Sequence, residues 1–154
     1  QRISIKDLEP RAYQGMFELN KYLSSASLDI RLKELIKIRA SQINGCAYCI
    51  ETHTADALKY GEDQKRIFAL SAWWESPRFT AKEKAVLAMT DEITLIAGKG
   101  LTEATYQNAR KYFNENEIAQ IIMQIGTINI WNRIAISTHM FHPEQSTAAT
   151  ADAV

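Results

Sequence analysis

The sequence contains few cysteines, few prolines and few glycines. Its 154 residues include two cysteines, three prolines and six glycines. A framework of several disulfides, as found in small secreted proteins, is therefore excluded. A chain of this length buries about 70% of the surface that its unfolded form exposes, so a single domain can form its core without disulfides. The scarcity of proline and glycine leaves long stretches in which helices are not interrupted.

An excess of charge of one sign is also missing. Eighteen lysines and arginines balance eighteen aspartates and glutamates, so the formal net charge at pH 7 is zero. Proteins that hold nucleic acids or anionic membranes need excess positive charge, and we expect neither partner. No run approaches the about 20 apolar residues of a membrane span, and the first residues lack the apolar stretch of a signal sequence. A lone cysteine pair in such a chain fits a reducing, cytoplasmic location.

Apolar residues recur at intervals of three and four, which predicts an all-α fold. Asp29, Thr102 and the pair Thr80 and Glu83 have the chemistry of helix N-caps. We expect one helical domain over residues 1–142 and a flexible C-terminal tail, rich in Ala, Ser and Thr, over residues 143–154. The predicted helices cover residues 10–24, 29–44, 46–60, 62–73, 80–97, 103–113 and, beginning at 114 or 116, a stretch to about 139, with a loop over 74–79.

The first and last predicted helices differ in how much of their circumference is apolar. In the last helix, Ile128, Ile130, Ile134 and Ile136 alternate as in a strand, but Ile118, Ile121, Ile122 and Ile125 have helical spacing. An apolar circumference predicts that this helix lies at the centre of a bundle or in a subunit interface, and hence that the chain forms a homo-oligomer. The first helix should have a single inner face, made of Tyr13, Met16, Phe17 and Leu23.

The two cysteines form a CxxC pair with a histidine in register. Cys46, Cys49 and His53 are separated by three and four residues, which places all three on one face of a helix. Cys46 would begin this helix, because Gly45 ends the preceding one. A helix N-terminus and a nearby proton acceptor lower the pKa of a cysteine, and the thiolate is the form that attacks peroxides or disulfides. The spacing also allows one sulfur to resolve a sulfenic acid on the other.

Glu34 is a candidate fourth member of this site. It is flanked at four residues on either side by Ile30 and Ile38, so its carboxylate follows a largely apolar strip. Burial there would raise the pKa of Glu34 and make it a candidate proton donor or acceptor. If Gly45 folds the two helices together, Glu34 comes near His53 and the thiols.

Each of these residues also has a simpler interpretation. The cysteines could be two small buried hydrophobic residues, and His53 could be a satisfied core histidine. Spacing alone favours a surface pair of Glu34 with Lys37 or Arg31. Trp73, Trp74 and Trp131 are most simply core or interface aromatics, with no chemical role. A metal site is a more specific alternative. Its three ligands from one helix would be Cys46, Cys49 and His53, and His139 or His142 would complete a tetrahedral set.

The stretch from Glu34 to His53 resembles a known family. It is similar to the E-x11-CxxC-x3-H motif of alkylhydroperoxidase AhpD-like proteins, within the carboxymuconolactone decarboxylase superfamily. A looser resemblance extends from about residue 10 to 140. It implies an all-helical fold, a multi-helix bundle with the CxxC at the N-terminus of a central helix, that commonly assembles as trimers or hexamers.

The resemblance implies a role for each site residue. Cys49 would be the peroxidatic cysteine and Cys46 the resolving one, while His53 and Glu34 would form a proton relay. Tyr48 stands where the best-known peroxidase members have a histidine. The implied partners are a small hydroperoxide substrate and a dithiol reductant, such as a dihydrolipoyl or thioredoxin-like protein, without flavin, haem or metal cofactors.

We therefore predict a thiol-dependent hydroperoxide reductase. Two other hypotheses stay open on the sequence. One is a lactone-decarboxylating lyase, which the superfamily name suggests. The other is a non-enzymatic redox-sensing or metal-binding module on the same helical scaffold.

Overall fold

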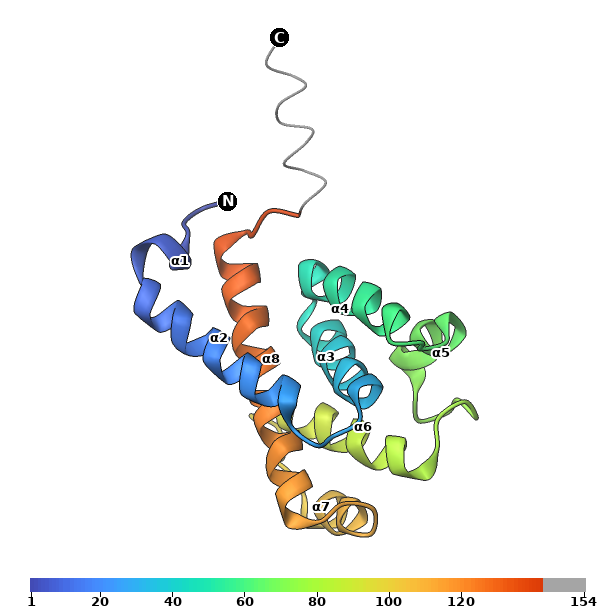
Figure 1. The fold of residues 1–154 in the computed structure, drawn as a ribbon. Coiled ribbons are helices and arrows are strands. Elements are labelled where there is room, and N and C mark those ends of the chain that lie inside the picture. The colour runs from blue at the N-terminus through green and yellow to red at the C-terminus, as the bar shows by residue number, and fades with distance from the viewer. Residues whose placement is uncertain (143–154) are drawn as a thin grey trace.

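A computed structural model describes residues 1–142, and within this range the chain forms helices and no strands (Figure 1). The predicted all-α fold is confirmed. The predicted tail over residues 143–154 lies outside the described residues. The helices are α1 (Ile5–Leu8), α2 (Pro10–Ser25), α3 (Ile30–Asn44), α4 (Ala47–Lys59), α5 (Gln64–Ala69), the 3-10 helix η1 (Leu70–Ala72), α6 (Ala81–Thr94), α7 (Glu103–Arg110) and α8 (Glu115–Thr138).

Helix α3 lies at the centre of the helical packing. Its most extensive contacts are with α4, α8 and α6, which pack around it (Figure 1). Leu35, Ile36 and Ile38 of this helix are completely buried. Because consecutive residues of α3 are buried, the helix is covered on more than one side, as expected for a helix in the middle of a bundle.

A tight turn joins α3 to α4. Gly45 has φ of 70°, in the left-handed region that glycine adopts without a steric penalty. The backbone N–H of Cys46 then donates to the carbonyl of Ser41 at 2.9 Å, which satisfies a carbonyl at the end of α3. The turn folds α4 back against α3, as the sequence predicts, and places the CxxC pair near the start of α4.

The predicted caps are present, whereas some predicted helix boundaries are wrong. Asp29 accepts a hydrogen bond from the backbone of Leu32, and Thr80 and Glu83 form a reciprocal capping box. Helix α6 ends at Thr94 rather than near residue 97, because Leu95 and Ile96 leave the core and are 59% and 57% exposed. The predicted helix over residues 62–73 is divided into α5 and η1, and the short α1 was not predicted.

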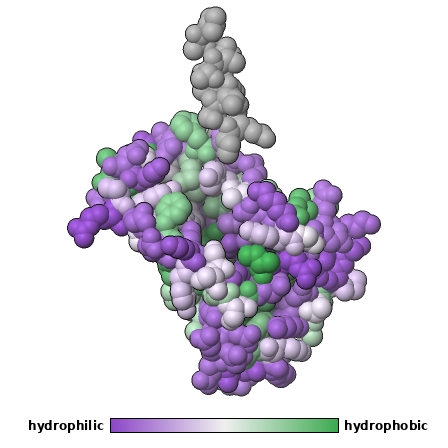
Figure 2. Space-filling model, viewed as in Figure 1, coloured by the Kyte–Doolittle hydropathy of each residue, from purple (hydrophilic) through white to green (hydrophobic). Residues whose placement is uncertain are grey.

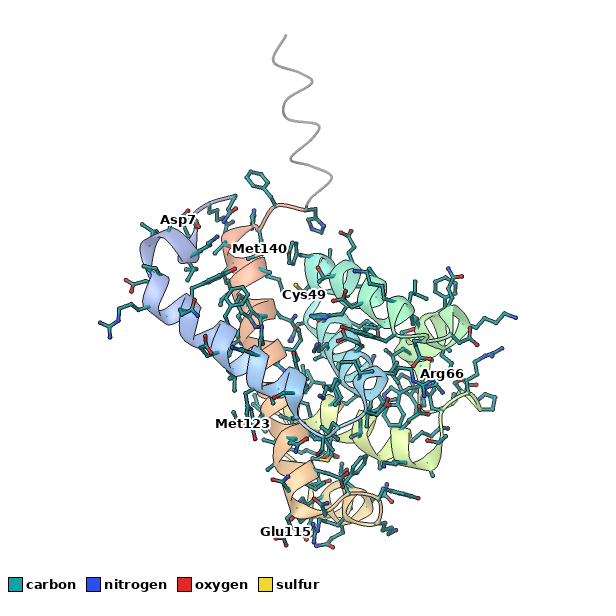
Figure 3. All side chains as sticks on the ribbon, in the orientation of Figure 1. Asp7, Cys49, Arg66, Glu115, Met123 and Met140 are labelled. Carbon is teal, nitrogen blue, oxygen red and sulfur yellow. The ribbon has the colours of Figure 1, made fainter. Side chains whose placement is uncertain are left out.

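Helix α8 is continuous through the stretch that alternates like a strand. Ile121, Ile125 and Ile128 are buried against the rest of the molecule. Its other side is open, and we call the residues that are 40–46% exposed there the outer α8 face: Ile122, Met123, Ile130 and Ile136. Met123 is labelled on this helix in Figure 3. Among residues 1–142, no helix combines the length and apolar character needed to cross a membrane.

Helix α2 covers α8 but does not bury its whole predicted inner face. Leu23 is buried, whereas Phe17 is 48% exposed, which corrects the prediction for that residue. One edge of Phe17 packs against Trp131 of α8, with ring centroids 5.8 Å apart. The surface is hollowed between α2 and α4, with hydrophilic residues along the rims (Figure 2).

Candidate functional site

The two thiols lie side by side at the start of α4. Cys46 is the N-cap residue, and its Sγ accepts a hydrogen bond from the backbone N–H of Cys49 at 3.4 Å. The two Sγ atoms are 2.7 Å apart and hydrogen-bonded to each other. Both cysteines are free and buried. Figure 3 shows Cys49 facing the end of α8, where Met140 lies. Because the two Sγ atoms are already 2.7 Å apart, a small rotation of the cysteine side chains would bring them to the S–S distance of a disulfide, about 2.05 Å.

The pair holds its negative charge on Cys46. The hydrogen bond from Cys49 lowers the pKa of the Cys46 thiol to about 7, against the opposing effect of burial, and the backbone N–H of Cys49 lowers it further. The pKa of Cys49 is raised, first by its hydrogen bond to Cys46 and then by burial. The proton that remains in the pair thus stays on Cys49. This agrees with the advantage that the helix N-terminus gives to Cys46.

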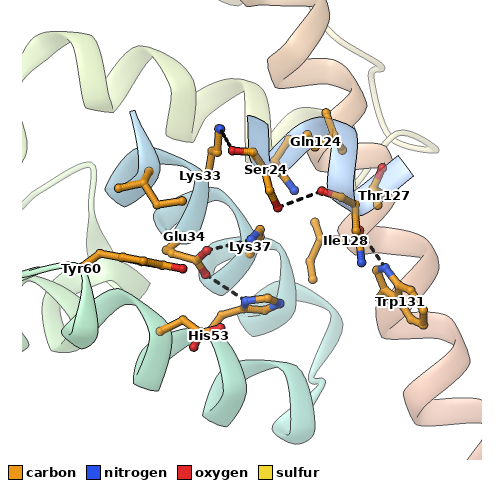
Figure 4. A pocket seen from close by; sticks show the side chains of 14 residues that line it. Ser24, Lys33, Glu34, Lys37, His53, Tyr60, Gln124, Thr127, Ile128 and Trp131 are labelled. Atoms are coloured by element: carbon orange, nitrogen blue, oxygen red, sulfur yellow. Dashed lines mark hydrogen bonds and ion pairs between the residues drawn. The ribbon is translucent and has the colours of Figure 1, made fainter. Parts of the chain in front are cut away.

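Glu34 and His53 form a pair across α3 and α4. His53 Nδ1 lies 2.9 Å from Glu34 Oε2, and the Lys37 ammonium lies 2.7 Å from Glu34 Oε1 (Figure 4). The Glu34 carboxylate therefore contacts His53, as expected if the two helices fold together, and also Lys37, one of the two partners that its spacing in the helix predicts. Arg31, the other, is instead 3.9 Å from Asp29 on the surface.

The expected direction of the Glu34 pKa is wrong. Burial does raise the pKa of this carboxyl, but the hydrogen bond from His53 and the charge and hydrogen bond of Lys37 together lower it below its ordinary value. An ionised carboxylate only accepts hydrogen bonds, so the proton of a neutral His53 is on Nδ1. His53 Nε2 is then the basic nitrogen of the ring.

A cavity borders Cys49 on the side of α2 and α8. It has a volume of about 240 Å³, and we call it the thiol cavity. His53 reaches its wall from α4, in register with Cys49 as predicted. The remaining wall is largely aromatic, because Tyr13, Phe17, Tyr48 and Trp131 line it. Trp131 meets Tyr13 and Phe17 edge-on and donates from Nε1 to Asn20 at 3.2 Å, which fixes its ring.

A second cavity lies on the other side of His53. This polar cavity has a volume of about 320 Å³ and is lined by Glu34, Lys37, Asp56 and Tyr60. Its wall also includes Asn20, His53 and Trp131, which line the thiol cavity as well, so the two cavities adjoin at these side chains. Because His53 lines both cavities, its ring can exchange protons with water in the polar cavity while an apolar molecule occupies the thiol cavity.

The predicted metal ligands do not come together. Within residues 1–142, the set that brings three ligand atoms within 4.8 Å of one another is Glu34, His53 and Asp56, and neither cysteine belongs to it. The ammonium of Lys37 already pairs with Glu34, so a cation there would meet a like charge. His142 instead lies near Glu51, with its ring edge toward Tyr48.

Reasoning from the sequence missed two kinds of site residue. The first is the aromatic wall of the thiol cavity. Trp131 lines this wall, whereas the sequence predicts only a packing role for it. The second is Asn132, which is completely buried in α8 near the two cysteines. The available signal was a strongly polar residue within an otherwise apolar helix, since such a side chain must find buried partners.

Comparisons with known proteins agree on the family and the fold. Residues 10–92 match the carboxymuconolactone decarboxylase family. The chain is 40% identical over 137 residues to the uncharacterized protein YdfG of Bacillus subtilis (strain 168), a match that covers 89% of this chain and 93% of YdfG.

Solved structures of other proteins share the fold. The Agrobacterium tumefaciens protein ATU0492, of unknown function and linked by name to the antioxidant defence protein AhpD, aligns with a TM-score of 0.89 and 38% identity over 92% of this chain and 97% of that chain. The alkylhydroperoxidase AhpD core of a peroxidase-related protein from Ralstonia eutropha JMP134 aligns with a TM-score of 0.79 over 90% of this chain and 75% of that chain. At 18% identity, the second likeness concerns the fold alone.

Proposed function

The chain belongs to the carboxymuconolactone decarboxylase family and has the AhpD-like fold, and from this premise we propose that it is a thiol-dependent hydroperoxide reductase. The observation that carries the proposal is the contact of two buried thiols, 2.7 Å apart, one of which, Cys49, borders a cavity together with a carboxylate-paired histidine. A structural cysteine pair would need neither the cavity nor the histidine. In this proposal Cys49 is the peroxidatic cysteine, because it borders the thiol cavity together with His53.

The first half of the cycle oxidises Cys49. His53 Nε2 takes the proton of Cys49 and becomes an imidazolium, and the Cys49 sulfur then attacks the distal oxygen of the hydroperoxide. The O–O bond breaks, Cys49 becomes a sulfenic acid, and the departing alkoxide takes a proton from the imidazolium of His53 to leave as an alcohol. Glu34 holds Nδ1 and stabilises the imidazolium while it exists.

The second half of the cycle closes and reopens the disulfide. The Cys46 thiolate attacks the sulfur of the Cys49 sulfenic acid and the S–O bond breaks. The hydroxide that is released takes one proton from solvent and leaves as water. An external dithiol then attacks the Cys46–Cys49 disulfide, becomes a disulfide itself, and returns two electrons to the pair. The proposed reductant is a dihydrolipoyl or thioredoxin-like protein, since both present paired thiols.

Substitution of each cysteine separates these steps. Cys49→Ser should abolish peroxide consumption in the presence of a dithiol such as dihydrolipoamide. Cys46→Ser should still consume about one equivalent of peroxide, because Cys49 can form a sulfenic acid, but it cannot close the disulfide and should accumulate that acid. The measurements are peroxide loss and trapping of the sulfenic acid with dimedone, after circular dichroism has shown that each variant is folded.

Three outcomes would contradict the proposal. Unchanged turnover in Cys49→Ser would exclude thiol chemistry at this position. Lactone decarboxylation that survives in a Cys46→Ser, Cys49→Ser double variant would favour the lyase. Oxidation of the thiols that changes the oligomeric state without any catalytic turnover would favour a redox sensor.

A further inference from the structure

A chain of buried and half-buried polar side chains joins α8 to α3, the helix that precedes the cysteine pair. The Asn44 amide donates to Asn132 Oδ1 at 2.8 Å and to Asn129 Oδ1 at 3.0 Å. The Asn132 amide donates in turn to Ser41 Oγ at 2.9 Å. Asn129 continues the chain away from the thiols, toward Thr94 at 3.2 Å. The network therefore joins the helix before the CxxC to the middle of α8.

The donors and acceptors of this network fix the orientation of Asn132. The hydroxyl of Ser41 donates to the carbonyl of Lys37 at 2.7 Å, so its oxygen is free to accept from Asn132. Asn132 Oδ1 accepts from Asn44, which confirms that Nδ2 is on the Ser41 side. An amide nitrogen has two hydrogens, and Ser41 takes one of them. The second hydrogen has to find a partner inside the protein, because Asn132 is 0% exposed.

The packing around Asn132 places the two sulfurs on the same side of α8 as its neighbours along the helix. Ile128 and Ala135 lie one helical turn before and after Asn132, and both pack in one cluster with Cys46 and Cys49. The amide of Asn132 also lowers the pKa of both thiols, as a donor beside each sulfur would. A hydrogen bond to an ionised acceptor is stronger than one to a neutral acceptor, so a donor here favours the thiolate over the thiol.

We propose that the second N–H of the Asn132 amide donates to the thiolate of the Cys46–Cys49 pair and keeps one of the two sulfurs ionised. Because this donor lies beside both sulfurs, it serves Cys46 in the resting dithiol and Cys49 when the charge moves there for attack. This inference rests on the proposed function only for its role in turnover. The ionisation of the pair can be measured without any peroxide.

The test is the pH dependence of thiol alkylation by iodoacetamide, with the modified cysteine identified by peptide mass. In the unchanged protein, modification of Cys46 should rise as the pH increases through about 7, because the thiolate fraction rises there. Asn132→Asp keeps the size of the side chain but replaces the donor with a negative charge. We expect the midpoint to rise by about one pH unit, which slows alkylation at pH 7 about fivefold.

Asn129→Asp is the matched control, since it makes the same change in the same helix and network but away from the sulfurs. Its midpoint should stay near that of the unchanged protein. Should Asn132→Asp fail to fold, Asn132→Ala and Asn132→Ser replace it: the alanine removes the donor and should raise the midpoint, while the serine hydroxyl should restore part of the difference.

Equal midpoints in the unchanged protein and in a folded Asn132 variant without the donor would overturn the inference. A shifted midpoint together with full peroxide turnover in Cys49→Ser would overturn the proposed function alone. The two proposals therefore fail on different measurements.

Discussion

At the scale of single residues, the site depends on how Glu34 is held. Its side chain is 3% exposed, and burial without partners would favour the neutral acid. His53 and Lys37 both contact the carboxylate, and their hydrogen bonds lower its pKa below the ordinary value. In the proposed cycle, Glu34 therefore acts through its charge, by orienting His53 and stabilising its imidazolium, and not as a proton donor in its own right.

The role of Glu34 in this pair predicts a loss of rate without a loss of fold. Glu34→Gln keeps the shape but removes the charge that stabilises the imidazolium of His53. The rate of peroxide-dependent oxidation of the thiols should fall by about 10²-fold, the usual contribution of a positioned acid or base. Stopped-flow measurement of thiol oxidation in a single turnover checks this. Glu18→Gln, an equivalent change on the exposed side of α2, is the control, and an equal rate in both variants would contradict the relay.

At the scale of elements, the turn between α3 and α4 decides whether the site exists. Glu34 belongs to α3, whereas the thiols and His53 belong to the start of α4. The only covalent link between them is the short turn at Gly45, which has a positive φ. Residues with a side chain are strained in this conformation, so the site relies on a glycine at that position.

A pair of glycine substitutions tests whether the positive φ at position 45 requires a glycine. A Cβ at Gly45 would meet no atom within 4 Å, so the cost of Gly45→Ala comes from the backbone alone. We expect the free energy of unfolding to fall by about 1 kcal/mol. Gly15 also has open space around its Cβ position but lies within α2 at an ordinary helical φ. Gly15→Ala should raise the free energy of unfolding by about 0.5 kcal/mol. Urea titrations measure both, and two changes of the same sign would contradict the argument.

At the scale of the whole molecule, the outer α8 face presents exposed apolar side chains that no part of the described chain covers. Ile96, Gly126, Ile130 and Arg133 border a depression there. We propose that this face packs against another copy of the chain, as the apolar circumference of the helix predicts. Large exposed apolar patches on a protein surface mark interaction sites, and apolar side chains gathered along one face of a helix are the material of such a patch.

The corresponding prediction concerns mass in solution. Ile130 is 44% exposed, so Ile130→Lys should leave the fold intact while placing a charge in the proposed interface. Light scattering should give an oligomer for the unchanged protein and a smaller species for the variant. Phe68, which is 70% exposed on α5, provides the control, because Phe68→Lys should not change the mass. A monomer for the unchanged protein at micromolar concentrations would contradict the proposal.

The local features of this protein follow from residue spacing and cap chemistry. Helical spacing set the register of Cys46, Cys49 and His53, and cap chemistry together with Gly45 set where α3 ends and α4 begins. These features depend on residues a few positions apart, whose relation is fixed once the helix forms.

The remaining features of the site depend on how the helices pack against one another. The direction of the Glu34 pKa, the aromatic wall built from α2, α4 and α8, and the placement of Asn132 beneath the thiols all join residues that are far apart in the chain. Spacing cannot show which groups become neighbours when helices pack, and the ionisation of a buried group depends on those neighbours. The motif was therefore visible in the sequence, whereas its electrostatics and its cavity came from the packing of helices around it.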